Sequence, residues 1–238
     1  MTREEFSDGF STLVNSYRRF KDFDKKEELD SIDFDEYEKS LWLTKAQEAL
    51  VVGLYNGRNV TGESFESTEE MRRYLETLVK TKTYSVSEQV AGSGVSSLSK
   101  FYEAPSDLAF IVMEQIALND DSLGCYNGAT IEVRPVTHDE YERIKFNPFV
   151  GPSKRRALRI DAGGSLLEII SKYTIGTYLL RYMSRPTPII LEDLPNGLTI
   201  DGVSIATDCV LNPLLHQTIL EQAVRMALSS KAINTKTE

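Results

Sequence analysis

The chain has 238 residues, of which 41% are hydrophobic and 26% are charged, and its formal net charge is −9. This composition is typical of a globular protein with a sizeable core, and it excludes fibrous and wholly disordered proteins. The negative charge argues against a protein that coats nucleic acid, because nonspecific phosphate binding needs many unopposed Lys and Arg side chains. We therefore expect any contact with nucleic acid to be local.

The two cysteines, Cys125 and Cys209, lie far apart and lack CxxC spacing, which favours reduced thiols over a disulfide framework or a zinc site. The chain does not open with a basic segment followed by an apolar run. No stretch approaches the ~20 apolar residues that a membrane span requires. We expect an intracellular protein that is neither exported through a signal peptide nor inserted into a membrane.

The first third of the chain is acidic and contains three predicted helices. Apolar residues recur at helical spacing in 4–21 and again in 37–55, so each segment has one face to bury. A capping box formed by Ser67 and Glu70 predicts a third helix, whose apolar face ends with Val79.

Residues 84–100 are rich in Ser and Gly and carry few apolar side chains, which indicates a mobile loop or a linker between domains. Beyond this segment the apolar period changes from 3.6 to 2, as in β-strands. A turn at 162–164 would join two of the strands in a hairpin, so we expect antiparallel pairing. The predicted strands cover 108–118, 130–136, 156–160, 166–171 and 174–182.

Two further capping signals predict helices. Thr137 with Glu140 would begin a short helix that ends near Phe146 and is inserted between two strands. The sheet is expected to end near Ile205. The Asn-Pro pair at 212–213 is typical of a helix start, and a long apolar face follows it.

The predicted fold class is α+β, with an N-terminal helical part, an antiparallel β-sheet with a short inserted helix, and a C-terminal helix. The predicted parts are an acidic helical part (1–83), a Ser/Gly-rich linker or loop (84–100), an antiparallel β part with a basic segment (101–211), and a C-terminal helix with a polar tail (212–238).

No combination of residues predicts an active site. His138 lies inside a capping box, where a surface histidine is expected, and His216 lies on the C-terminal helix, as a histidine at the edge of the core or at an interface. Ser153 and Lys154 are adjacent on an extended segment and point to opposite faces, so they cannot share a proton. The acidic run 22–38 lacks the spacing of a calcium loop and is interpreted as a solvated connection. We expect no enzyme activity, no catalytic, metal-binding or cofactor-binding residue, and no cofactor.

The segment from Arg143 to Arg185 concentrates positive charge in an otherwise acidic chain. It contains nine basic residues and two acidic ones, Asp161 and Glu168, so its net charge is +7 against −9 for the whole chain. Such a difference suggests a surface that meets something negative, either nucleic acid or the acidic face of another subunit.

Within this segment, residues 147–156 combine the features of an interface. Two prolines reduce the entropy lost on docking, Phe149 offers an aromatic anchor, and the arginines can make bidentate contacts to carboxylate or phosphate. A solvated basic turn would account equally well for any one residue, but less well for the whole cluster. The candidate interface residues are Asn147, Pro148, Phe149, Pro152, Lys154, Arg155, Arg156 and Arg159.

The chain resembles the ring proteins of the head-to-tail connector of crAss-like tailed bacteriophages. The resemblance is carried by THDEYERIKFNPFVGPSKRRALRID, EIISKYTIGTYLLRYMSRPTPIIL, LNPLLHQTILEQAVRMAL and EYEKSLWLTKAQEALVVGLYNG. It covers most of the chain and leaves out the Ser/Gly-rich segment and the polar ends.

The resemblance implies a structural virion protein without enzyme activity, made in the host cytoplasm and located in the neck of the virion. It implies a closed ring of one protein, with twelve copies to match the portal and the tail. The implied partners are further copies of the chain, the portal protein and other connector or tail proteins. The implied lumen passes genomic DNA during ejection, with transient contact, and no membrane partner is implied.

The residues agree with this interpretation in two ways. A head-to-tail ring needs one patch that complements a different patch on the neighbour, and an acidic helical part with a basic β part supplies opposite signs. A net-negative lumen wall would also avoid trapping phosphates as the genome leaves. The alternative is a DNA-binding accessory protein that acts through the basic segment 143–185, chiefly through Lys154, Arg155, Arg156 and Arg159.

Overall fold

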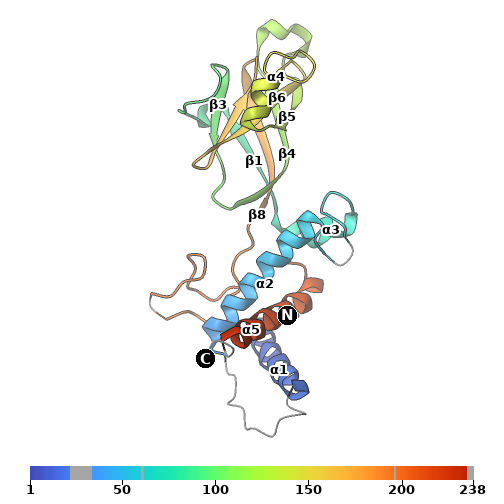
Figure 1. Ribbon diagram of the computed structural model, residues 1–238. Coiled ribbons are helices and arrows are strands. Elements are labelled where there is room, and N and C mark those ends of the chain that lie inside the picture. The colour runs from blue at the N-terminus through green and yellow to red at the C-terminus, as the bar shows by residue number, and fades with distance from the viewer. Residues whose placement is uncertain (22–33, 60–61, 196, 235–238) are drawn as a thin grey trace. The chain divides into compact units, whose positions relative to one another are not determined.

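The computed structural model describes residues 1–21, 34–59, 62–195 and 197–234. The chain forms two compact units (Figure 1). The helical unit contains Met1–Leu78 and Pro186–Glu238, and the β unit contains Val79–Arg185. The β unit is therefore inserted into the sequence of the helical unit. The fold is α+β, as predicted.

The helical unit is built on α1 (Arg3–Lys21), α2 (Glu36–Asn56), α3 (Glu69–Tyr74) and α5 (His216–Asn234). Helix α5 packs against both α1 and α2, and the apolar stripes predicted for these three helices meet in the core. Most of the acidic run 22–38 lies outside the described residues, although Asp35 caps α2 by accepting a hydrogen bond from Glu38 N at 2.6 Å. The core residues of the three helices include Phe6, Phe10, Val14, Leu43, Ala46, Leu54, Ile219, Ala223, Val224 and Ala227.

The third predicted helix differs from the structure in its start and its length. The cap of α3 is Thr68, whose hydroxyl accepts a hydrogen bond from Met71 N at 3.4 Å. Ser67 does not cap the helix, because its hydroxyl accepts from Ser64 N at 2.7 Å in the preceding turn. The helix ends at Tyr74, and a 3-10 turn (Glu76–Leu78) leads directly into the first strand.

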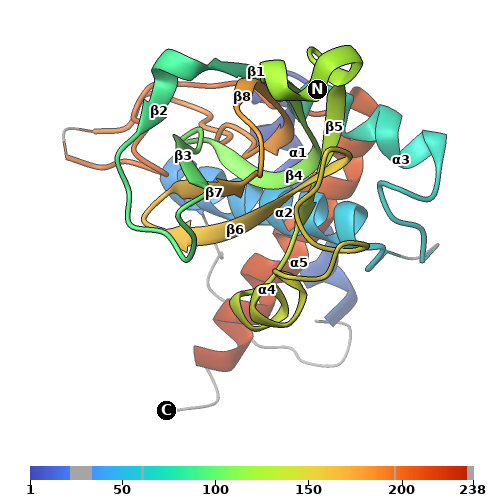
Figure 2. The same ribbon diagram turned by 90° about the horizontal axis from the view of Figure 1, so that it is seen from above.

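The β unit holds one eight-stranded sheet in the order β1-β8-β4-β5-β6-β7-β3-β2, and Figure 2 shows that it curls. All neighbouring strands are antiparallel except β5 and β6, which are parallel because α4 (His138–Ile144) crosses between them. The predicted antiparallel sheet is therefore confirmed except for this one parallel pair. The strands are β1 (Val79–Ser85), β2 (Gln89–Val90), β3 (Ser99–Glu103), β4 (Leu108–Leu118), β5 (Thr130–Pro135), β6 (Arg156–Gly163), β7 (Leu166–Ile170) and β8 (Ile175–Ser184).

Two apolar clusters pack against this sheet. The larger one includes the rings of Tyr84, Tyr102 and Tyr178, whose centroids are 4.9–5.4 Å apart. The smaller one includes Tyr141 of α4 and covers the opposite face of β6. Strand β6 is therefore buried on both sides, and this determines which of its charged residues can reach solvent.

Residues 84–100, predicted to be a linker, belong to the β unit. They contain the end of β1, a 3-10 turn, β2 and the start of β3. The buried carboxylate of Glu168 on β7 holds this segment, since it accepts hydrogen bonds from Val95 N at 2.9 Å and from the hydroxyl of Ser99. A side chain at Gly94 would overlap Glu168, so a small residue is required there. The Ser and Gly content reflects close packing against the sheet.

The sheet ends at Ser184, not near Ile205. The chain from Pro186 to the start of α5 joins the helical unit because polar side chains of α2 bind its backbone. Leu191 N donates to Ser40 at 3.0 Å, and Ile189 N donates to Thr44 at 3.1 Å. These bonds replace the strand ladder that the apolar pattern suggests.

The remaining helix signals are confirmed. Thr137 caps α4 by accepting from Glu140 N at 3.2 Å, and Asn212 caps a 3-10 turn that continues into α5. His138 is exposed, whereas His216 is buried beside Phe6, and burial lowers its pKa. Both cysteines are free thiols. Among the helices of the described residues, none combines the length and apolar character that crossing a bilayer requires.

Candidate protein–protein interface

The candidate interface lies on the loop that joins α4 to β6. We call residues 145–156 the aromatic-basic loop, since it contains two phenylalanines and four basic residues and no acidic residue. It leaves α4 where the parallel β5-α4-β6 crossover turns back to the sheet. Its ends are therefore fixed by a helix and by a central strand of the sheet.

Local hydrogen bonds hold the first half of this loop. Gly151 N donates to Asn147 O at 2.8 Å, and the Asn147 side chain accepts from Phe149 N at 2.9 Å. A Cβ atom at Gly151 would lie 2.6 Å from Ile144 O, so only glycine allows this approach. Pro152 is buried beneath the turn. The backbone that presents the aromatic rings is thus fixed before any partner binds.

The two phenylalanine rings of the loop are almost fully in solvent. Phe146 is 88% exposed and Phe149 is 86% exposed, more than any other large hydrophobic side chain of the described residues. The sequence predicts Phe149 as an interface residue, but it predicts Phe146 only as the end of a helix. The missed signal is the pair itself, since two aromatics three positions apart flank an Asn-Pro turn.

Lys154 and Arg155 occupy the tip of a tight turn in the second half of the loop. Ser153 N donates to Arg156 O at 2.8 Å, which closes this turn and leaves both tip side chains exposed. The Lys154 ammonium lies 4.4 Å from the ring centroid of Tyr126. Within the part of the chain that the structure describes, Arg155 makes no salt bridge, so its charge is available to a partner.

Arg156 stabilises the loop through contacts within the β unit and is not free to contact a partner. Its Nε lies 3.0 Å from a Glu132 carboxylate oxygen, and its Nη1 donates to Phe149 O at 3.1 Å. The side chain therefore ties the loop to β5 and fixes the carbonyl of the exposed aromatic residue.

Arg159 lies inside the β unit and is only 8% exposed. Its Nη1 is 3.1 Å from Glu114 and its Nε is 3.5 Å from Asp161, but neither N–H bond points at an acceptor, so the attraction is Coulombic rather than a directed hydrogen bond. Tyr178 donates to the other oxygen of Glu114 at 2.6 Å. Burial raises the pKa of Glu114, and Arg159 and the tyrosine hydrogen bond oppose that effect.

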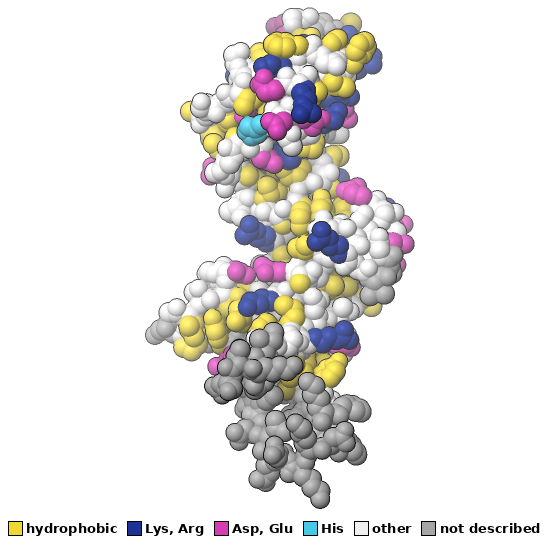
Figure 3. Space-filling model, in the orientation of Figure 1, with side chains coloured by type: hydrophobic (Ala, Val, Ile, Leu, Met, Phe, Trp, Pro, Cys, Tyr) yellow, Lys and Arg dark blue, Asp and Glu magenta, His cyan; other side chains and the backbone are white. Residues whose placement is uncertain are grey.

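The structure therefore divides the eight candidate residues into two sets. Five of them are exposed on the aromatic-basic loop: Asn147, Pro148, Phe149, Lys154 and Arg155. The other three, Pro152, Arg156 and Arg159, are buried or engaged within the β unit. Figure 3 shows hydrophobic, basic and acidic side chains intermingled at the end of the β unit that carries α4.

The two units of this protein differ in net charge. The β unit contains 13 basic and 12 acidic residues, a net charge of +1, whereas the helical unit contains 14 basic and 24 acidic residues, a net charge of −10. The surplus of +7 in 143–185 is largely balanced by acids elsewhere in the β unit, such as Glu114 and Glu132. A local surplus of positive charge remains at the aromatic-basic loop.

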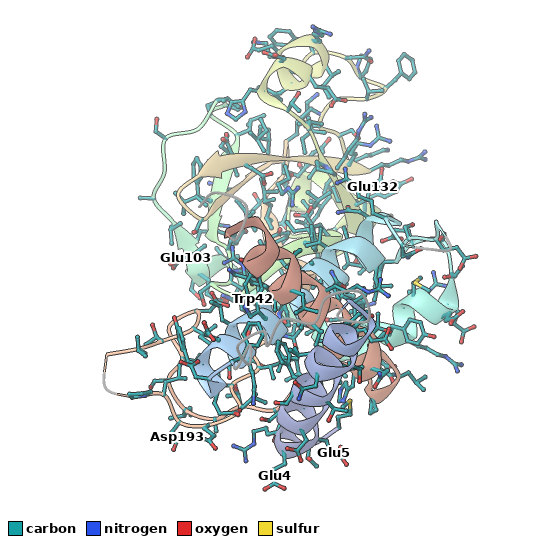
Figure 4. All side chains as sticks on the ribbon, turned by 60° about the horizontal axis from the view of Figure 1, so that its bottom comes forward. Glu4, Glu5, Trp42, Glu103, Glu132 and Asp193 are labelled. Atoms are coloured by element: carbon teal, nitrogen blue, oxygen red, sulfur yellow. The ribbon has the colours of Figure 1, made fainter. Side chains whose placement is uncertain are left out.

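The helical unit carries an acidic pocket with a volume of ≈ 930 Å³. Figure 4 shows Glu4 and Glu5 at the start of α1 and Asp193 on the chain between Pro186 and α5, all projecting outward. Two lining residues of the pocket are already paired: Arg3 forms a salt bridge with Asp208 at 3.1 Å, and Glu36 forms one with Lys39 at 2.7 Å. The acidic lining residues are Glu4, Asp8, Glu36, Glu192 and Asp208.

Sequence reasoning missed this pocket because its acids come from three distant parts of the chain. Of these acids only Glu36 belongs to the acidic run 22–38, and none has a recognisable spacing, so only the return of residues 186–211 to the helical unit brings them together.

A rigid loop with exposed aromatic rings, on a chain whose two units differ in charge, is typical of a structural protein that works through contacts between folded surfaces. The comparisons with known proteins define this class further. The family model "Phage tail ring protein 3/4" matches residues 1–238, and the chain belongs to this family.

Two curated relatives come from Bacteroides phage crAss001. The chain is 51% identical to "Ring protein 3" over 233 residues, which are 97% of this chain and 96% of the relative. It is 29% identical to "Ring protein 4/5" over 236 residues, which are 95% of this chain and 92% of the relative. The predicted resemblance to crAss-like phage ring proteins is confirmed. The protein is a structural, tail-related ring protein of the phage virion.

Proposed function

We propose that this protein forms a closed connector ring between the portal and the tail, with DNA passing through its lumen. The observation that carries the proposal is the aromatic-basic loop, which keeps Phe146 and Phe149 in solvent on a fixed backbone. Burying a phenylalanine contributes about 2 kcal/mol. A protein that leaves two such rings exposed on an ordered loop gains this energy only when a partner covers them.

The charges of the two units favour assembly in one orientation. Contacts between two helical units would bring together surfaces of net charge −10, so symmetric pairing through them is opposed by repulsion. Contact between the β unit of one copy and the helical unit of the next brings a local basic surface to an acidic one. Such contacts between different surfaces close into rings when the rotation between copies fits. A dodecamer would match a twelvefold portal and tail.

The negative charge of the helical unit also fits a DNA passage. A wall with a surplus of carboxylates repels phosphates, so the genome can move without binding to the ring. Contact with DNA in the lumen would then be transient.

The alternative of a DNA-binding accessory protein has less support from the geometry. Two of its four key residues, Arg156 and Arg159, are engaged with carboxylates of the β unit. Lys154 and Arg155 remain for phosphate contact, and two charges provide little of the electrostatic affinity that DNA binding requires.

The proposal is tested with purified protein, alone and with the portal protein of the same phage. We expect rings in negative-stain micrographs and a mass of twelve copies in native mass spectrometry, with rings stacking on the portal. A species that stays monomeric at all concentrations and does not bind portal would overturn the proposal.

A further inference from the structure

We infer that the aromatic-basic loop of one copy docks into the acidic pocket of the helical unit of the next copy. This inference rests on the proposed ring and names the two surfaces that build it. It assigns a partner to the exposed loop and an occupant to the pocket.

The loop has the properties of a preformed ligand. Its backbone is fixed by the Asn147 turn, by Gly151 and by the Arg156 bridge to Glu132, so docking costs little loop entropy. Its tip presents two long cationic side chains, Lys154 and Arg155, with exposed aromatic rings beside them on the same loop. Aromatic and arginine side chains of this kind are the usual anchors of protein interfaces.

The pocket has the complementary charge and a suitable size. Three of its acids, Glu4, Asp8 and Glu192, are exposed and make no salt bridge with any residue that the structure describes. A volume of ≈ 930 Å³ is at the upper end of the range for small-ligand sites, which is enough to admit the ends of a lysine and an arginine. The two cations that also line the pocket are engaged, Arg3 with Asp208 and the Met1 ammonium with His216 and Glu5. The three exposed carboxylates therefore gain an ion-pair partner when another copy supplies a cation.

A second copy fits better than any other partner of this charge. The two surfaces lie on different units of the same chain, so one copy can give its loop to a neighbour and receive a loop from another. Every copy then uses both surfaces once, which is the requirement for a closed head-to-tail ring.

Charge reversal tests this pairing directly. The loop variant is Lys154→Glu with Arg155→Glu, and the pocket variant is Asp8→Lys with Glu192→Lys. Each variant alone should lose its rings at a concentration at which the unchanged protein is fully assembled, because its loop and pocket then carry the same sign. Native mass spectrometry would follow assembly, and circular dichroism with thermal unfolding would establish that each variant folds.

Mixing the two variants in equal amounts should restore rings. The acidic loop of one variant matches the basic pocket of the other, and the reverse pair also matches, so copies alternate around the ring in a 1:1 ratio. An even number of copies, such as twelve, permits this alternation. A matched control, Lys100→Glu with Lys172→Glu, reverses two exposed charges of the β unit outside the loop and should assemble normally.

The outcomes separate this inference from the proposed function. If the unchanged protein forms no ring, with or without portal, the proposed function fails. If it forms rings and the loop variant does so equally well, the pairing is overturned while the ring stands. If each variant loses its rings and the mixture does not recover them, the loop binds a surface other than this pocket, and the inference is likewise overturned.

Discussion

At the level of single residues, changes at Phe146 and Phe149 should affect assembly but not folding. Replacing both with serine should leave the monomer as stable as before, because rings that are 88% and 86% exposed have almost no packing to lose. Surface changes of this kind alter the free energy of unfolding by about 0.5 kcal/mol or less. Assembly should weaken, since the apolar area that association buries is removed. Urea unfolding measures the first effect, and sedimentation velocity measures the second.

Leu214→Ser provides the matched control, because this leucine is 73% exposed but lies in the helical unit, outside the loop. It should change neither stability nor assembly. A double phenylalanine variant that assembles as tightly as the unchanged protein would show that the rings are not part of the interface.

Arg159 illustrates where the sequence pattern is right and its interpretation is not. Alternation along β6 correctly separates Leu158 and Ile160 from Arg159, but it assigns the charged residue to solvent. In the structure α4 covers the face that carries the two apolar residues, so Arg159 points the other way, to Glu114. The burial of the Arg159 face depends on the parallel crossover that places α4 on the sheet. The apolar period of a single strand carries no information about that crossover.

We expect Arg159→Met to destabilise the fold by about 3 kcal/mol near pH 7, because it leaves the Glu114 carboxylate buried without its cation. Burial raises the pKa of Glu114 in the folded protein, because the protonated side chain is easier to bury than the carboxylate. The stability that the buried, protonated Glu114 contributes is therefore fully present below the ordinary pKa of the group. It is lost as the pH rises through the folded-state pKa. Without Arg159 that loss should be larger. The difference between the two proteins should therefore shrink as the pH falls from 7 towards 4.5, as measured by urea unfolding at each pH.

Two further variants check the cause of this effect. Arg181→Met removes an exposed arginine of β8 and should have little effect at any pH. Adding Glu114→Gln to Arg159→Met should recover part of the lost stability at pH 7. An equal cost at both ends of the pH range would mean that the lost interaction is packing and not charge.

At the level of elements, helix α2 shows how a stripe of buried polar side chains can bind an extended segment of the chain. Ser40, Thr44 and Gln47 are buried and follow helical spacing, and all three bind the extended segment 187–191 or its neighbours. The sequence pattern predicts the apolar stripe of this helix but not the polar one. Hydroxyl and amide side chains have the same pattern whether they face water or a backbone, so the packing of residues 186–211 was not predictable from it.

Thr44→Val should destabilise the helical unit by about 1–3 kcal/mol. The substitution keeps the shape of the side chain but leaves Ile189 N, which donates to Thr44 at 3.1 Å, without an acceptor in a buried place. Thr218→Val on α5 is the control, because Thr218 is exposed and the same change there should be nearly neutral. Thermal unfolding of both variants would measure the difference. Equal effects would mean that the Thr44 hydroxyl does not hold the segment.

At the level of the whole molecule, the sequence predicts the elements better than their grouping. The boundaries near 83 and 211 assume that neighbouring segments fold together, whereas the helical unit is made from both ends of the chain. Capping boxes and apolar periods depend on residues within a few positions, so they locate α4 and α5 well. The return of the chain after Ser184 depends on contacts with α2, and the acidic pocket exists only because of that return.

Salt should distinguish assembly through opposite charges from DNA binding. Between about 0.1 M and 1 M salt the screening length falls from about 10 Å to about 3 Å, so a loop held in an acidic pocket should bind about tenfold more weakly, or ~1.4 kcal/mol. The exposed rings should keep a residual association at high salt. Binding to duplex DNA through Lys154 and Arg155 alone would have a slope of about −2 in log K against log salt, since each phosphate contact contributes about −0.9. Analytical ultracentrifugation measures the first effect and fluorescence anisotropy with labelled DNA the second. Rings that are indifferent to salt, together with DNA binding of much steeper slope, would favour the accessory protein over the connector ring.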